Sequence, residues 1–188
     1  MDHSELAREH IEEAHHRREP GARGVAMLVA VLAAALAVAE IGAKSTQNAY
    51  LTHHVQAADY WGFYQTRNLR AGLLDATAEL MASLPNAADP QVQRRIEAAR
   101  AEAARLRDDP QAGDGAKQIE AMARAEERRR EVAFRKYHSF EATVGALEIA
   151  IVLASVSVVI RVRWLTYGAG AIGGLAVLFG LATAAGLL

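Results

Sequence analysis

Apolar and polar residues form separate long blocks along the chain. Three apolar blocks stand out, at residues 24–43, 142–160 and 165–188. Each is close to or above the ~20 residues that a helix needs to cross the hydrocarbon core of a bilayer. The third block has no ionisable side chain, and the first two have one each, Glu40 and Glu148. The pattern therefore predicts three transmembrane helices.

The long segment between the first two blocks, residues 44–141, is polar, charged and rich in alanine. Its helical pattern is interrupted at residues 83–90 and 108–115, where proline, glycine and aspartate gather. Proline cannot continue a helix interior, and the residue before it avoids the helical conformation. Three helical pieces are therefore expected, at residues 45–83, 90–108 and 115–141. Because nothing breaks the pattern at residues 44 and 141, the outer pieces should continue into the membrane spans.

Long helices outside the membrane must each bury an apolar stripe to be stable. The predicted stripes are Leu69, Leu73, Ala76, Leu80 and Leu84 in the first piece, Val92, Ile96, Ala99, Ala103 and Leu106 in the second, and Ile119, Met122, Ala125 or Glu126, Arg129 and Ala133 in the third. Narrow stripes of this kind suit close antiparallel packing or a coiled-coil-like self-association. The predicted fold is all-α, an integral membrane protein with a long helical hairpin or bundle domain between its first and second spans.

Composition narrows the function classes. The chain has no cysteine, which excludes disulfides, thiolate metal sites and cysteine nucleophiles. Its net charge of -1 does not favour binding to nucleic acid. The sequence shows no phosphate-binding loop, dinucleotide fingerprint or nucleophile elbow. We therefore predict a non-enzymatic protein, with no catalytic residue, cofactor or metal assigned, no nucleic-acid partner and no small-molecule substrate identified.

The leader, residues 1–23, is rich in histidine and glutamate. Its histidines are His3, His10, His15 and His16. Such clusters can bind Zn²⁺ or similar ions, but the spacing is not that of a zinc-binding helix. The favoured interpretation is a solvated, partly helical leader. It is too long and too acidic for a secretory n-region, so the first span is expected to be retained.

Orientation follows from the short connections. The link between the second and third spans, residues 161–164, contains Arg161 and Arg163 and lies on the same side as the leader. Cations near the spans are almost balanced between the two sides, but short connections carry more weight than the long middle segment. We therefore expect a cytoplasmic N-terminus and an extracytoplasmic middle region.

An aromatic cluster marks the first helical piece. The segment contains Asp59, Tyr60, Trp61, Phe63, Tyr64, Gln65 and Arg67. On a helix, Trp61 and Tyr64 share a face, with Tyr60 and Phe63 flanking it. On a straight helix Trp61 would lie ~27 Å beyond Ala43, too far for the headgroup belt. The favoured interpretation is a packing core between helical arms, and the alternatives are an oligomer interface, docking on lipid after a bend, or a ligand cage.

This cluster also carries a resemblance to a known family. The motif residues are Ala57, Ala58, Asp59, Trp61, Phe63, Tyr64, Gln65 and Arg67. With the His/Glu-rich leader, the charged helical segment and the arginine-linked last spans, they resemble the bacterial membrane-protein family called domain of unknown function 4337. Gly62 departs from the pattern, since alanine is expected there. The resemblance implies an architecture in the bacterial inner membrane and no activity.

Three further sets of residues are candidates within or near the spans. Glu40 and Glu148 are expected at similar depth, and an intramembrane carboxylate suggests ion or proton binding. The favoured interpretation is structural, with Glu40 paired to Lys44, and Glu148 protonated or hydrogen-bonded to Ser45, Thr46 or Thr143 on a neighbouring helix. Gly170, Gly174 and Gly180 are expected to support close helix packing in lipid. The basic run at residues 127–136 is either a contact for anionic lipid or a solvated helical face.

Two functional hypotheses follow. The first is a structural or interaction protein of the inner membrane that self-associates, with the lipid bilayer and further copies of itself as its partners. The alternative is an oligomeric ion or proton channel that uses Glu40 and Glu148.

Overall fold

The computed structural model describes residues 20–187, and these residues form helices joined by short connections. The helices are α2 (Pro20–Ala82), α3 (Pro90–Arg107), α4 (Ala116–Ile160) and α5 (Arg163–Ala184). No strand occurs among the described residues, which confirms the all-α prediction. Three helices, α2, α4 and α5, are long and apolar enough to cross a membrane. The predicted leader lies almost wholly outside the described residues.

The chain divides into two compact units. One comprises the residues up to Thr46 together with those from Arg135 onward, and is called the membrane unit here. The other, Gln47–Phe134, is called the arm unit. Helices α2 and α4 each contribute residues to both units without a break, as expected from the absence of proline and glycine clusters between the apolar and charged blocks.

The predicted breaks are confirmed by the ends of α3. Asp89 caps its first turn, since the Asp89 side chain accepts a hydrogen bond from the Gln91 backbone N–H at 2.7 Å. Pro90 occupies the first helical position, where a missing N–H costs nothing. In the connection to α4, Gly113 has a φ of 73°, a left-handed conformation that favours glycine.

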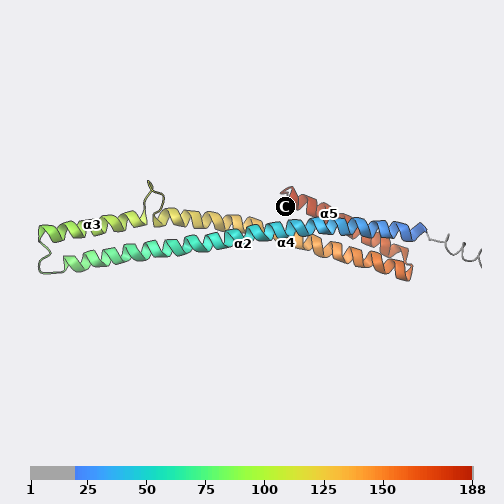
Figure 1. The fold of residues 1–188 in the computed structure, drawn as a ribbon, viewed down its shortest axis with the longest axis horizontal. Coiled ribbons are helices and arrows are strands. Elements are labelled where there is room, and N and C mark those ends of the chain that lie inside the picture. The colour runs from blue at the N-terminus through green and yellow to red at the C-terminus, as the bar shows by residue number, and fades with distance from the viewer. Residues whose placement is uncertain (1–19, 188) are drawn as a thin grey trace, which may run out of the picture. The chain divides into compact units, whose positions relative to one another are not determined.

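The arm unit is a helical hairpin in which α3 lies beside the later part of α2 (Figure 1). Its core contains Ala71, Ala103 and Leu106, with Leu74 packed against them. The stripe predicted on the second piece is confirmed, since Ile96, Ala103 and Leu106 are at most 2% exposed. Small side chains at the centre let the helix axes approach closely.

The stripe predicted on the first piece is wrong as a core within the protomer. Leu69, Leu73 and Leu80 are 75%, 67% and 65% exposed. The face of α2 that is buried instead carries alanines, and Ala57, Ala71 and Ala78 are at most 3% exposed. Alanine side chains are small, so this face can pack closely against neighbouring helices. The leucines lie on another face of α2 and stay exposed.

The stripe predicted on the third piece is partly right. Ile119, Glu126 and Ala133, seven residues apart, are buried. Met122 and Arg129 are exposed, and the packed face runs through Ala116 and Ala123 instead.

In the membrane unit, the first part of α2, the last part of α4 and α5 lie side by side (Figure 1). The core comprises Leu32, Ala39, Leu147, Ala150 and Ala176. Two glycines permit the close approach. A Cβ on Gly42 would lie 2.8 Å from the Phe140 ring, and one on Gly173 would collide with Leu32.

Buried hydroxyl groups in this unit are satisfied locally. Thr143 donates to the Ser139 carbonyl at 2.9 Å, and Thr183 to the Phe179 carbonyl at 3.0 Å. Ser157 donates to the Ala154 carbonyl and accepts from Thr166 across the turn to α5. Such pairing is what a hydrocarbon environment requires, because no water is present to replace it.

Candidate functional site

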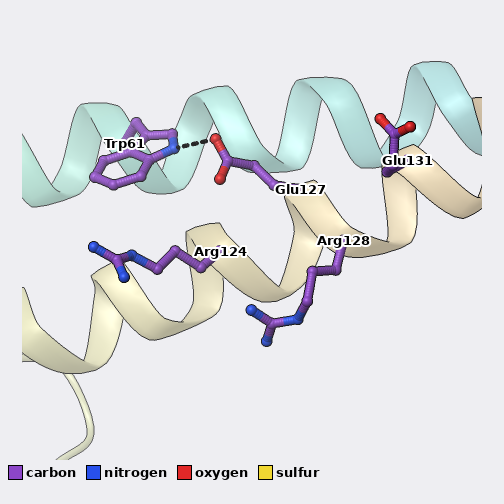
Figure 2. Close-up of a pocket in the computed structure, with 5 residues that line it drawn as sticks. All are labelled: Trp61, Arg124, Glu127, Arg128 and Glu131. Carbon is purple, nitrogen blue, oxygen red and sulfur yellow. Dashed lines mark hydrogen bonds between the residues drawn. The ribbon is translucent and has the colours of Figure 1, made fainter.

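The aromatic motif lies in the arm unit, where Trp61 bridges α2 and α4. The Trp61 Nε1–H donates to the Glu127 carboxylate at 3.0 Å, and its ring meets Tyr64 edge to face with centroids 5.3 Å apart. Figure 2 shows Trp61 opposite Glu127, with Arg124 and Arg128 on the same helix as Glu127. Together with Glu131 these residues line an open groove of about 530 Å³.

A second polar contact between the helices lies toward the start of the arm. His53 Nδ1 and the Glu126 carboxylate are 2.6 Å apart, and Arg129 donates to the other Glu126 oxygen at 2.5 Å. The Glu126 side chain is only 8% exposed. The hydrogen bond from His53 and the charge of Arg129 hold the Glu126 pKa below its ordinary value. Glu126 is therefore an ionised group held within an alanine-rich seam.

A third network ties the α3–α4 connection to the hairpin. Arg67 on α2 donates to Asp114 at 2.5 Å. Arg105 on α3 donates to Asp109 at 2.9 Å and to Glu102. The Ala112 backbone N–H and then Arg105 lower the Asp109 pKa, so this carboxylate is also ionised. A further pair, Arg107 with Asp75, joins α3 to α2.

The structure therefore separates the members of the predicted motif. Trp61 and Tyr64 are brought together, Tyr60 is half-buried, and Arg67 pairs with Asp114. Asp59, Phe63 and Gln65 are exposed.

Sequence reasoning missed the partners that lie far along the chain, Glu126, Glu127 and Asp114. The signal for Glu126 was present, since it occupies a seven-residue spacing with Ile119 and Ala133.

The two carboxylates of the spans lie on the surface of the membrane unit. Glu40 and Glu148 are both exposed. Within residues 20–187 neither forms a hydrogen bond or an ion pair, and Glu40 does not pair with Lys44. Their predicted functional role stays a prediction.

The glycines of the last span have different surroundings. Gly180 is buried, and a Cβ there would lie 3.0 Å from Thr143, so it packs against α4. Gly170 and Gly174 have open space around them in the protomer. The packed face of α5 runs instead through Ala169, Gly173, Ala176 and Gly180. A packing role for Gly170 and Gly174 thus needs a partner beyond the protomer.

No cluster of three metal-ligating side chains occurs among the residues that the structure describes. The histidines of the leader lie outside those residues. Polar contacts that join helices in the described chain include His53 with Glu126, Trp61 with Glu127, and Arg107 with Asp75.

Comparison with protein families gives a match to the model described as Domain of unknown function (DUF4337), over residues 22–186. Comparison with curated proteins and with solved structures gives no match.

Proposed function

The chain belongs to the family of domain of unknown function 4337, whose description names no activity, and we propose that it is a non-enzymatic multi-pass protein of the bacterial inner membrane that self-associates. The contact runs through the outer face of α2 in the arm unit. Its role is structural, as a scaffold built from copies of itself.

One observation carries this proposal, a stripe of apolar residues that the protomer does not cover. It comprises Leu69, Leu73, Ala76 and Leu80, called the leucine stripe here, spaced by four, three and four residues. Its three leucines are 65% to 75% exposed. Spacing of this kind is that of a coiled-coil seam, in which two helices bury one narrow line of side chains.

The apolar stripe of α3 is already buried within the protomer. Ala71, Ala103 and Leu106 bury one another in the hairpin, so α3 offers no comparable uncovered line. Copies in one membrane share an orientation, so two leucine stripes would meet in parallel. Each residue of the stripe would then face the same residue of the other copy. Because the stripe has no charged side chain, this arrangement brings no like charges together.

The polar side chains of the arm unit support a structural rather than a catalytic role. Glu126 pairs with Arg129 on its own helix. Asp109 and Asp114, in the α3–α4 connection, pair with Arg105 and Arg67. The partners of Glu126 and Asp109 lower the pKa of each carboxyl group, whereas a general acid or base needs a pKa near the working pH.

Disulfide trapping in membranes tests the self-association. The chain has no cysteine, so a single introduced thiol reports one position. We expect Leu73→Cys to give a cross-linked dimer on mild oxidation. Ala101→Cys, on an exposed position of α3, is the matched control and should stay monomeric. Absence of any dimer for Leu73→Cys, with the protein folded and in the membrane, would remove the proposal.

An oligomeric ion or proton channel is the second candidate, and the exposure of Glu40 and Glu148 favours it. A carboxylate facing lipid is costly, and further copies around the membrane unit would shield it. Proton or cation flux in liposomes that falls when both residues become glutamine would support the channel. Flux at the level of empty liposomes, with or without the substitutions, would rule it out.

A further inference from the structure

A groove lies between α2, α4 and α5 in the membrane unit. Its volume is about 330 Å³, within the ~300–1,000 Å³ of small-molecule sites. Small side chains at Ala34, Ala39 and Gly180 leave the space, and Phe140, Leu147 and Val177 form its walls. Thr143 is its one polar side chain, and that hydroxyl donates to the Ser139 carbonyl. The groove therefore suits an apolar occupant.

The groove occupies one end of the spans. Along α4 it extends from Phe140 to Leu147, and along α5 from Val177 to Ala184. At ~1.5 Å per residue, each stretch is ~10 Å long. The hydrocarbon core of a bilayer is ~30 Å thick, so one leaflet supplies ~15 Å. The groove thus matches the upper part of an acyl chain from a single leaflet.

A cation lies at the end of the groove that is nearer the surface. Lys136 precedes Phe140 by one helical turn on α4, on the same face. Its Nζ is 3.9 Å from the position of a Cβ on Gly186, just past the end of α5. Lys136 is half-buried, and it forms no ion pair or hydrogen bond within the described part of the chain. A lysine near the end of a membrane span can lay its alkyl stem along apolar surface and keep its ammonium at the headgroup level.

We propose that this groove binds an anionic phospholipid of the surrounding leaflet, with one acyl chain against Phe140 and Leu147 and the phosphate paired with Lys136. The apolar lining, the depth of one leaflet and the unpaired ammonium at the headgroup end all match that ligand. The carboxyl end of the α5 dipole also attracts the Lys136 ammonium. That attraction alone would give no preference for one lipid over another.

The test measures lipid binding to the full chain in mild detergent by native mass spectrometry, with phosphatidylglycerol and phosphatidylcholine as probes. Lys136→Gln is compared with Lys44→Gln, which removes an exposed lysine elsewhere in the membrane unit. Ala34→Phe, which fills the groove, is compared with Ala37→Phe on an exposed position of α2 outside it.

We expect the wild type to prefer phosphatidylglycerol. Lys136→Gln should weaken the binding of phosphatidylglycerol about fivefold, which is the effect of one cation near a membrane surface. The binding of phosphatidylcholine should not change. Ala34→Phe should weaken the binding of both lipids, and the two control variants should bind them as the wild type does.

Equal binding of both lipids by the wild type would overturn the proposal. So would an Ala34→Phe variant that dissociates an oligomer while lipid binding is unchanged, since the groove would then hold a second copy. If Ala34→Phe fails to fold by circular dichroism, the comparison of Lys136→Gln with Lys44→Gln decides the matter.

Discussion

Glu126 occupies a position in the packed seam of α4 that its neighbours Ala116, Ala123 and Ala133 fill with methyl groups. A carboxylate there is stable only because His53 and Arg129 meet its two oxygens. The register of α2 against α4 is thus specified by a polar contact in an otherwise alanine-rich line. A shift of either helix by one residue would separate Glu126 from His53 and leave Arg129, on its own helix, as its one cationic partner.

The pH dependence of the arm unit follows from that carboxylate. The Glu126 pKa is lowered in the folded state from an ordinary value of 4.5. The unfolded chain therefore takes up the proton first as pH falls, so the stabilisation is full above about pH 4.5 and is lost on acidification through the folded pKa. We expect Glu126→Gln to lower the melting temperature at pH 7 and to flatten its decline below about pH 4.5.

Circular dichroism in detergent between pH 3 and pH 7 measures this effect. Glu131→Gln is the matched control, because Glu131 is exposed on the same helix and forms no ion pair in the described chain. Identical pH profiles for Glu126→Gln and the wild type would contradict the assigned role.

Glu126 also shows which features could be predicted from the sequence alone. Its seven-residue spacing with Ile119 and Ala133 predicted burial of Glu126 or its neighbour, but His53 lies in another helix, far along the chain. Partners of that kind depend on the register between helices, which no local pattern encodes. The same holds for the aromatic motif. The contact of Trp61 with Tyr64 follows from their spacing on one helix, whereas the contact of Trp61 with Glu127 could not be predicted from a local pattern.

At the scale of elements, proline and glycine clusters predicted where helices end, because their effect on the backbone is local. The choice between two stripes on α2 was not predictable in the same way. One line carries leucines and the other carries alanines, and hydrophobicity alone favours the leucines. Close packing against α3 selects the alanines, and this selection requires the geometry of the partner helix.

Leucine truncations separate the two stripes. Leu106→Ala removes a side chain that is 1% exposed and should lower the free energy of unfolding by about 2–5 kcal/mol. Leu80→Ala acts on a side chain that is 65% exposed, so protomer stability should change little while self-association weakens. Denaturant unfolding and sedimentation of both variants measure these effects, and equal destabilisation by the two would contradict the assignment of faces.

Gly42 is one of the residues that allow close helix packing in the membrane unit. Gly42→Ala places a Cβ 2.8 Å from the Phe140 ring, and overpacking of this kind costs about 1–3 kcal/mol. Gly145→Ala is the matched control, since nothing lies within 4 Å of its Cβ. We expect a lower melting temperature for the first variant only, and a melting temperature unchanged from the wild type would show that the helices separate more easily than this contact implies.

At the scale of the whole molecule, the segregation of apolar and charged blocks was enough to predict three spans and a helical insertion. The two compact units follow the same division, with boundaries near residues 46 and 135. Block patterning is informative because the transfer of a highly charged helix into hydrocarbon is strongly unfavourable. The prediction of which compartment the arm unit faces depends on a weaker signal, the arginines of one short connection.

That orientation is open to a direct measurement. Arg161 lies in the turn between α4 and α5, and Arg163 begins α5. Short basic connections stay on the cytoplasmic side. We therefore expect Gln111→Cys, at an exposed position between α3 and α4, to react with an impermeant maleimide in intact cells. A cysteine in place of Trp164, exposed on the side of that turn, should react only after the membrane is opened. The reverse pattern would place the arm unit in the cytoplasm.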